Sequence, residues 1–94
     1  MFEIQRDAAG VIHFKGMFVA GKSKTAEEIL DGIDEDVVLD FSALKYISSS
    51  GLGLLIKVQR RLDASGHKVK IINSSDHIRE LFAVTRFDLI FDIE

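Results

Sequence analysis

In the middle of the chain stands Tyr46-Ile47-Ser48-Ser49-Ser50-Gly51-Leu52-Gly53-Leu54-Leu55, in which three serines and a glycine separate two different apolar patterns. Before it, residues 37–41 form an almost continuous apolar run, which predicts a strand covered on both faces at the centre of a sheet. After it, apolar residues recur at helical spacing from 52 to 62, which predicts a helix over about residues 50–64. The segment therefore indicates a strand that leads directly into a helix.

The three serines have two interpretations. A serine oxygen can accept a hydrogen bond from one of the free N–H groups at a helix start, and such capping is the commonest use of serine there. A helix start also suits a phosphate, because the free donors and the helix dipole both favour negative charge. One serine could thus carry a phosphoryl group, or all three could only cap the helix.

Composition limits the possible classes of protein. The chain has 94 residues, 47% hydrophobic and 29% charged, as expected of one small globular domain. A net charge of −3 offers no basic excess for nucleic acid or an anionic membrane. Without cysteine there is no disulfide framework or thiol chemistry. No signal peptide and no apolar segment of about 20 residues is present, so the sequence predicts a soluble cytoplasmic protein without membrane insertion.

The flanking segments alternate between strand and helix patterns. Residues 2–6 and 11–15 predict an antiparallel hairpin, and the segment from Gly16 to Lys24 is read as a loop. Thr25 and Glu28 form a capping box that predicts a short helix ending near Gly32. Further expected elements are a strand over residues 68–72, a helix capped within residues 73–76, and a docked apolar tail over residues 87–93. The class is α/β, with a mixed sheet of four to five strands, an N-terminal β-hairpin and about three to four packed helices.

The helix over residues 50–64 has a wider apolar surface than one core contact requires. Leu54 and Val58 lie on a second face beside the first. Either a neighbouring helix or a partner protein covers this face, and a neighbouring helix is the preferred interpretation.

Residues 16–23 match the phosphate-loop pattern G-x-x-x-x-G-K-[ST], and residues 37–40 resemble the apolar strand that ends in a magnesium-binding Asp. Three features oppose a nucleotide site: the short chain, the hairpin before the motif, and the lack of further glycines within it. The preferred interpretation is a surface loop with solvated Lys22 and Lys24. His13 is likewise read as a solvated strand residue. No catalytic residues, metal ligands or cofactor are predicted.

Four segments together resemble the STAS domain of bacterial anti-sigma factor antagonists: residues 37–42, 46–55, 66–73 and 78–91. The resemblance covers nearly the whole chain and agrees in the order of elements, which assigns residues 1–94 to one STAS domain. It implies a protein that is not an enzyme, that binds a serine-kinase anti-sigma factor of the GHKL type, and that thereby releases a sigma factor.

The resemblance also implies a modification site. The kinase of such a pair phosphorylates the antagonist at the start of the second helix, and a PP2C-type phosphatase reverses the reaction. The family motif reads Asp-Ser-Ser/Thr/Ala-Gly-Leu, with the modified serine two residues before the glycine. That position is Ser49 here, with Ser50 and Ser48 as the next candidates. This sequence departs from the family pattern at two places. Ser48 stands where the family motif has Asp, and residues 16–19 stand where the family often has Gly-x-Leu/Ile-Asp after the hairpin.

The resemblance places the partner-binding surface around the modified serine. The expected surface consists of Ser48, Ser49, Ser50, Gly51, Leu52 and Leu54. Because the loop before the first helix is near this site in the family, Lys22 or Lys24 is expected to pair with a phosphate on Ser49. Two alternatives remain: a non-phosphorylated STAS scaffold subunit of a transporter ATPase or signalling complex, and a small phosphate-loop nucleotide-binding protein.

Overall fold

A mixed five-stranded sheet forms the centre of the computed structural model, which describes all residues, 1–94. The strands lie side by side in sequence order: β1 (Phe2–Arg6), β2 (Ile12–Phe18), β3 (Val37–Ile47), β4 (Val69–Ile72) and β5 (Asp92–Ile93). β1 is antiparallel to β2, and the other neighbours are parallel. The predicted mixed sheet, its N-terminal hairpin and its central strand are confirmed.

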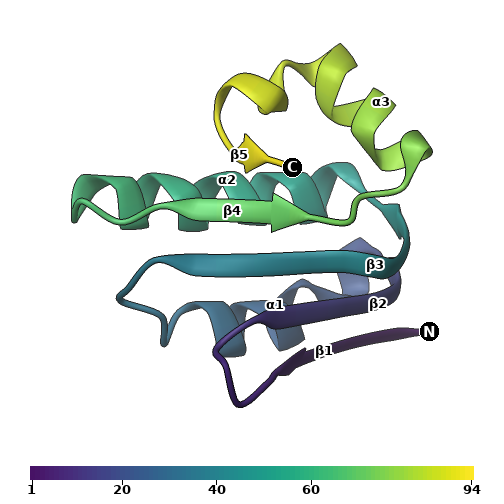
Figure 1. Ribbon diagram of the computed structural model, residues 1–94. Helices are drawn as coiled ribbons and strands as arrows, with labels where there is room; N and C mark the ends of the chain where they lie inside the picture. The colour runs from purple at the N-terminus through teal and green to yellow at the C-terminus, as the bar shows by residue number, and fades with distance from the viewer.

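Three helices accompany the sheet: α1 (Ser23–Leu30), α2 (Ser49–Ala64) and α3 (Asp76–Thr85). Two 3₁₀ turns, η1 (Ala20–Lys22) and η2 (Phe87–Leu89), lie before α1 and after α3. α1 and α2 pass behind the sheet, while α3 and the C-terminal tail lie beyond the β4 side (Figure 1). None of these helices is long and apolar enough to span a membrane.

The helices leave one face of the sheet uncovered, which corrects the prediction for residues 37–41. Val37, Leu39 and Phe41 are buried under the helices, but Val38 and Asp40 point to the other face and are only half-buried. An almost continuous apolar run was therefore a misleading sign of a strand covered on both sides.

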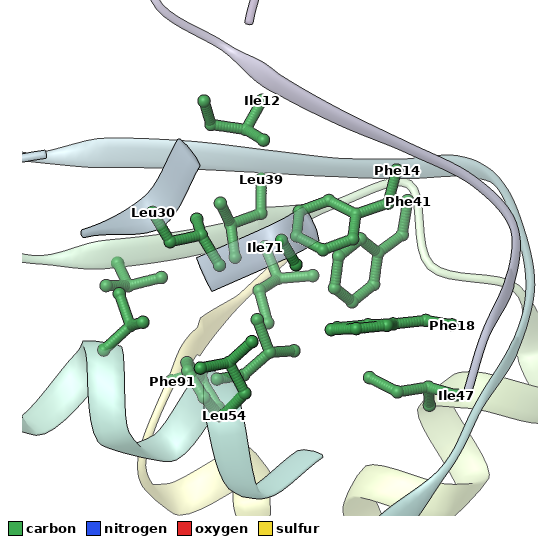
Figure 2. Packing of buried hydrophobic residues seen from close by; sticks show 14 of the residues in the cluster. Ile12, Phe14, Phe18, Leu30, Leu39, Phe41, Ile47, Leu54, Ile71 and Phe91 are labelled. Atoms are coloured by element: carbon green, nitrogen blue, oxygen red, sulfur yellow. The ribbon is translucent and has the colours of Figure 1, made fainter. Parts of the chain in front are cut away.

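Twenty-one buried apolar residues form a single core between the sheet and the helices. Phenyl rings run through it as a continuous series in which neighbouring centroids are 4.7–6.4 Å apart. Figure 2 shows Phe14, Phe41 and Phe18 close together, with Ile47 beside Phe18. The series links Phe2, Phe18, Phe14, Phe41, Phe82 and Phe91. The apolar tail thus docks on the core, as predicted, through Phe91.

The segment predicted as a loop after the hairpin is largely regular structure. Gly16 and Phe18 belong to β2 and are paired with Leu44 and Ile47 of β3. α1 begins at Ser23, so Thr25 lies inside its first turn, and the N-cap position falls on Lys22 without a side-chain hydrogen bond. The predicted capping box is therefore wrong. Pairing with the long β3 strand holds residues 16–18 in an extended conformation. The sequence indicated a turn here because of Gly16, and it does not show this pairing.

The second apolar face of α2 is buried inside the protein, in agreement with the prediction that a neighbouring helix and not a partner protein covers it. Leu54 and Val58 are 7% and 3% exposed, and α1 packs against α2. Arg61 of α2 also reaches the end of α1, where its guanidinium donates to the carbonyl oxygens of Leu30 and Ile33 at 2.9 Å each. These two helices are therefore held together by both apolar and polar contacts.

Candidate functional site

The start of α2 is held by Ser48. Its backbone is extended, its Oγ accepts a hydrogen bond from Gly51 N at 3.1 Å, and its carbonyl oxygen accepts from Leu52 N at 2.9 Å. Its own N–H donates to the carbonyl oxygen of Phe18 at 2.9 Å, which joins the end of β2 to the start of the helix. Ser48 is thus the N-cap residue, and its hydroxyl is already used.

Ser49 and Ser50 occupy the first two positions of α2, and both are exposed. Neither hydroxyl makes a hydrogen bond to another protein group. The sequence left capping and phosphate binding open for all three serines. In the structure one serine caps the helix and the two others are free at the surface.

The structure removes the apolar part of the predicted partner surface. Gly51 is buried, and Leu52 and Leu54 are 6% and 7% exposed. A Cβ added at Gly51 would lie 3.0 Å from Ile47 Cγ1 and 3.1 Å from a ring carbon of Phe18. These residues fix α2 to the sheet, so their side chains are not available to a partner. Of the six predicted residues, only the serines reach the surface.

Lys22 and Lys24 lie on the connection between β2 and α1. Both are exposed, and neither forms an ion pair with an acidic side chain. Lys22 belongs to η1, which packs against α2. The structure thus brings the 3₁₀ turn that carries Lys22 to the helix that begins with Ser49.

The phosphate-loop match is not a phosphate site. Gly16 lies within a strand at φ +88°, and the carbonyl of Met1 occupies the space where a Cβ would stand. The N–H of the next residue, Met17, donates to that same carbonyl at 2.7 Å. Since residues 16–18 are bound into the sheet, they cannot curl around a phosphate. The interpretation of this segment as a small nucleotide-binding site is wrong.

His13, predicted as a solvated strand residue, is 45% exposed but belongs to a polar cluster that the sequence did not predict. Its Nε2 lies 2.8 Å from Asp7 Oδ2, and its Nδ1 lies 3.7 Å from Asp40 Oδ2. The hydrogen bond from His13, followed by that from Val11 N, lowers the pKa of Asp7. The hairpin turn and the central strand meet here, which only the β2–β3 register shows. No three acidic or histidine residues are arranged to hold a metal ion.

The described fold agrees with the comparisons to known proteins. Residues 3–94 match the STAS domain family model, and the chain belongs to this family. A candidate anti-sigma factor antagonist of Bordetella bronchiseptica, BtrV, is 33% identical over 64 residues, which are 68% of this chain and 55% of BtrV. The chain therefore matches about half the length of that relative.

Solved structures of the same fold include candidate and named anti-sigma factor antagonists. A candidate antagonist of Thermotoga maritima, TM1081, has a TM-score of 0.80 at 16% identity, over 99% of this chain and 85% of that one. The phosphorylated form of SpoIIAA, a Bacillus cell fate determinant, has a TM-score of 0.71 at 17% identity, over 100% and 91% of the two chains. The fold inferred from the family resemblance is thereby confirmed.

Replacing Ser48 with alanine removes the N-cap hydrogen bond. We expect Ser48→Ala to lower the free energy of unfolding by about 1 kcal/mol, the usual effect of losing a serine cap. Ser50→Ala is the matched control, because Ser50 is exposed and its hydroxyl makes no hydrogen bond to another protein group, and it should change stability by less than about 0.5 kcal/mol. Urea unfolding curves measure both values. Equal losses for the two variants would show that Ser48 is not the cap.

Proposed function

We propose that this STAS domain is an anti-sigma factor antagonist that binds a serine-kinase anti-sigma factor and is switched by reversible phosphorylation of Ser49. The observation that carries the proposal is the free, exposed hydroxyl of Ser49 at the first position of α2. An enzyme can reach this hydroxyl without disturbing the cap formed by Ser48. The kinase is expected to be of the GHKL type and the opposing phosphatase of the PP2C type, as the family resemblance implies.

A phosphate at this position suits the fold. Phosphorylation adds about −1.5 to −2 charges and three acceptor oxygens. The first turn of α2 has backbone N–H groups without helical partners and the positive end of the helix dipole, and both favour that charge. Lys22 and Lys24 lie on the connection whose 3₁₀ turn packs on the same helix. They are proposed to pair with the phosphate.

Ser49 is preferred over its two neighbours for separate reasons. Modification of Ser48 would take away the hydroxyl that accepts from Gly51 N. Ser50 is as exposed as Ser49, but it falls one residue away from the modified position of the family motif. Ser49 is the residue that meets both conditions, because it is free at the surface and two residues before Gly51.

The switch is proposed to act on association and not on the fold. The phosphate adds charge at the surface, while the residues that fix α2 to the sheet are buried beneath it. A partner that fits the neutral serine would have to bury an unpaired charge after phosphorylation, which is costly. Support for a stable modified fold comes from SpoIIAA, whose phosphorylated form has the same fold as this chain.

Incubation with the cognate kinase and ATP tests the site. We expect the mass of one phosphate group to be added, and peptide mass spectrometry should place it on Ser49. Ser49→Ala should abolish the addition, and the matched variant Ser50→Ala should retain it. A phosphate mapped to Ser48 or Ser50 would contradict the site assignment. A partner that binds without ever phosphorylating the protein would instead favour the non-phosphorylated scaffold function.

A further inference from the structure

The face of the sheet opposite α1 and α2 carries two large exposed apolar side chains. Met17 is 46% exposed and Tyr46 is 41% exposed, and the two are partners in the β2–β3 register. No helix covers this face, which is the one turned to the viewer in Figure 1. Parallel strands usually have both faces covered, and Tyr and Met are enriched in protein interfaces. This part of the face is therefore suited to contact with another protein.

Two lysines give the same area a positive charge. Lys15 and Lys45 are exposed, and neither has an acidic partner within ion-pair distance. The exposed carboxylate of Glu3 lies opposite Lys15 in the β1–β2 register, so two lysines against one carboxylate leave this area positive in a chain whose net charge is −3. A shallow hollow of about 320 Å³ lies between them, lined by Met1, Lys15, Gly16, Met17, Ala43 and Lys45. Its chemistry complements an apolar side chain flanked by carboxylates.

This area adjoins the start of α2. Tyr46 lies three residues before Ser49 in the sequence. Met17 immediately precedes Phe18, whose carbonyl oxygen accepts the hydrogen bond from Ser48 N. A partner that contacts Ser49 can therefore continue across the end of β2 and β3 onto the open face.

We infer that the open-face patch, defined as Met17, Ala43 and Tyr46 with Lys15 and Lys45, binds an acidic segment of the protein partner that contacts Ser49. The partner's identity rests on the proposed function, whereas the chemistry of the patch does not. Lys45 lies four residues before Ser49 and Lys15 is paired with Ala43, so carboxylates held at these lysines would approach the phosphate on Ser49 from the end of β3. Like charges brought together in an interface are costly, so phosphorylation would repel this segment and favour release.

A peptide titration tests the patch without any kinase. The probe is a short synthetic peptide in which glutamates flank a central Leu-Phe pair, and the control peptide carries lysines in place of the glutamates. In ¹H–¹⁵N spectra the acidic peptide should shift the amide signals of Met17, Ala43, Lys45 and Tyr46, and the basic peptide should not. The inference would be overturned if millimolar acidic peptide caused no shifts, or shifts only at other residues. It would also be overturned if both peptides caused equal shifts, or if raising the protein concentration alone caused the same shifts.

Charge reversal gives the second measurement. The double variant Lys15→Glu/Lys45→Glu should bind the acidic peptide, and the unmodified kinase partner, about tenfold more weakly at low salt. Lys57→Glu/Lys68→Glu is the matched control, because it changes the net charge equally at two exposed lysines elsewhere. Equal weakening by both variants, or none, would overturn the inference. If the peptide result holds while Ser49 is never phosphorylated, only the proposed switch fails.

Discussion

Phe18→Ala is expected to lower the free energy of unfolding by about 3–5 kcal/mol, the range for removing a buried phenyl ring from a packed core. Phe18 is fully buried, and its ring lies 4.7 Å from that of Phe2 and 5.7 Å from that of Phe14. It also lies directly beneath Gly51, in the first turn of α2. The same substitution should therefore loosen the helix start that presents Ser49.

Met17→Ala is the matched control for this prediction. Met17 precedes Phe18 in the same strand but points to the open face and is 46% exposed. Its loss should cost less than about 1 kcal/mol, because little buried surface is removed. Chemical denaturation of both variants gives the comparison, and amide hydrogen exchange shows whether the first turn of α2 opens more often in Phe18→Ala. Similar losses for the two variants would contradict the packing described for β2.

Arg61→Ala is expected to lower the free energy of unfolding by about 2–3 kcal/mol, because hydrogen bonds from a charged donor are worth more than neutral ones. Its guanidinium donates to the carbonyl oxygens of Leu30 and Ile33, which lie at and beyond the end of α1 and would lose this donor. It also lies 3.3 Å from Asp34 Oδ1, but that carboxylate is 90% exposed and should contribute little.

Arg60→Ala provides the control for Arg61, because Arg60 precedes it in α2, is exposed, and has a guanidinium that forms no hydrogen bond or ion pair. Its unfolding free energy should change by less than about 0.5 kcal/mol. Arg61→Lys should recover only part of the loss, since a single ammonium cannot reproduce the planar fork of the guanidinium. Equal stability of Arg60→Ala and Arg61→Ala in urea would show that α1 does not depend on this contact.

The elements that the sequence predicted well are those in which local pattern and tertiary contacts agree. Residues 37–41 are apolar and β-branched, and they form part of the central strand. Ser48 and Ser75 stand at helix starts and cap them through their hydroxyls, as their chemistry suggests. The alternating pattern of residues 2–6 likewise matches β1. In these places the strongest local preference is also the conformation that buries the apolar side chains.

The misses occur where tertiary pairing overrides a local signal. Gly16 was read as the start of a loop, yet it lies in β2 at positive φ because β1 and β3 hold it on both sides. β3 continues to Ile47, although apolar and polar residues do not alternate regularly around Ser42, Lys45 and Tyr46. The alternation is lost there because the β2–β3 register shifts. Leu52 and Leu54 were expected both on the apolar faces of α2 and, from the family resemblance, in the partner surface, and their burial shows that they pack inside the protein.

The affinity of the kinase partner for the unmodified and the Ser49-phosphorylated protein tests the central claim most directly. Calorimetric titration of the two forms, each first shown by circular dichroism to keep the same fold, gives both dissociation constants. We predict binding about a hundredfold weaker for the phosphorylated form, because its charge must be buried or repelled at the interface. Equal affinity of the two forms would contradict the account, since the free hydroxyl at the start of α2 would then not control association.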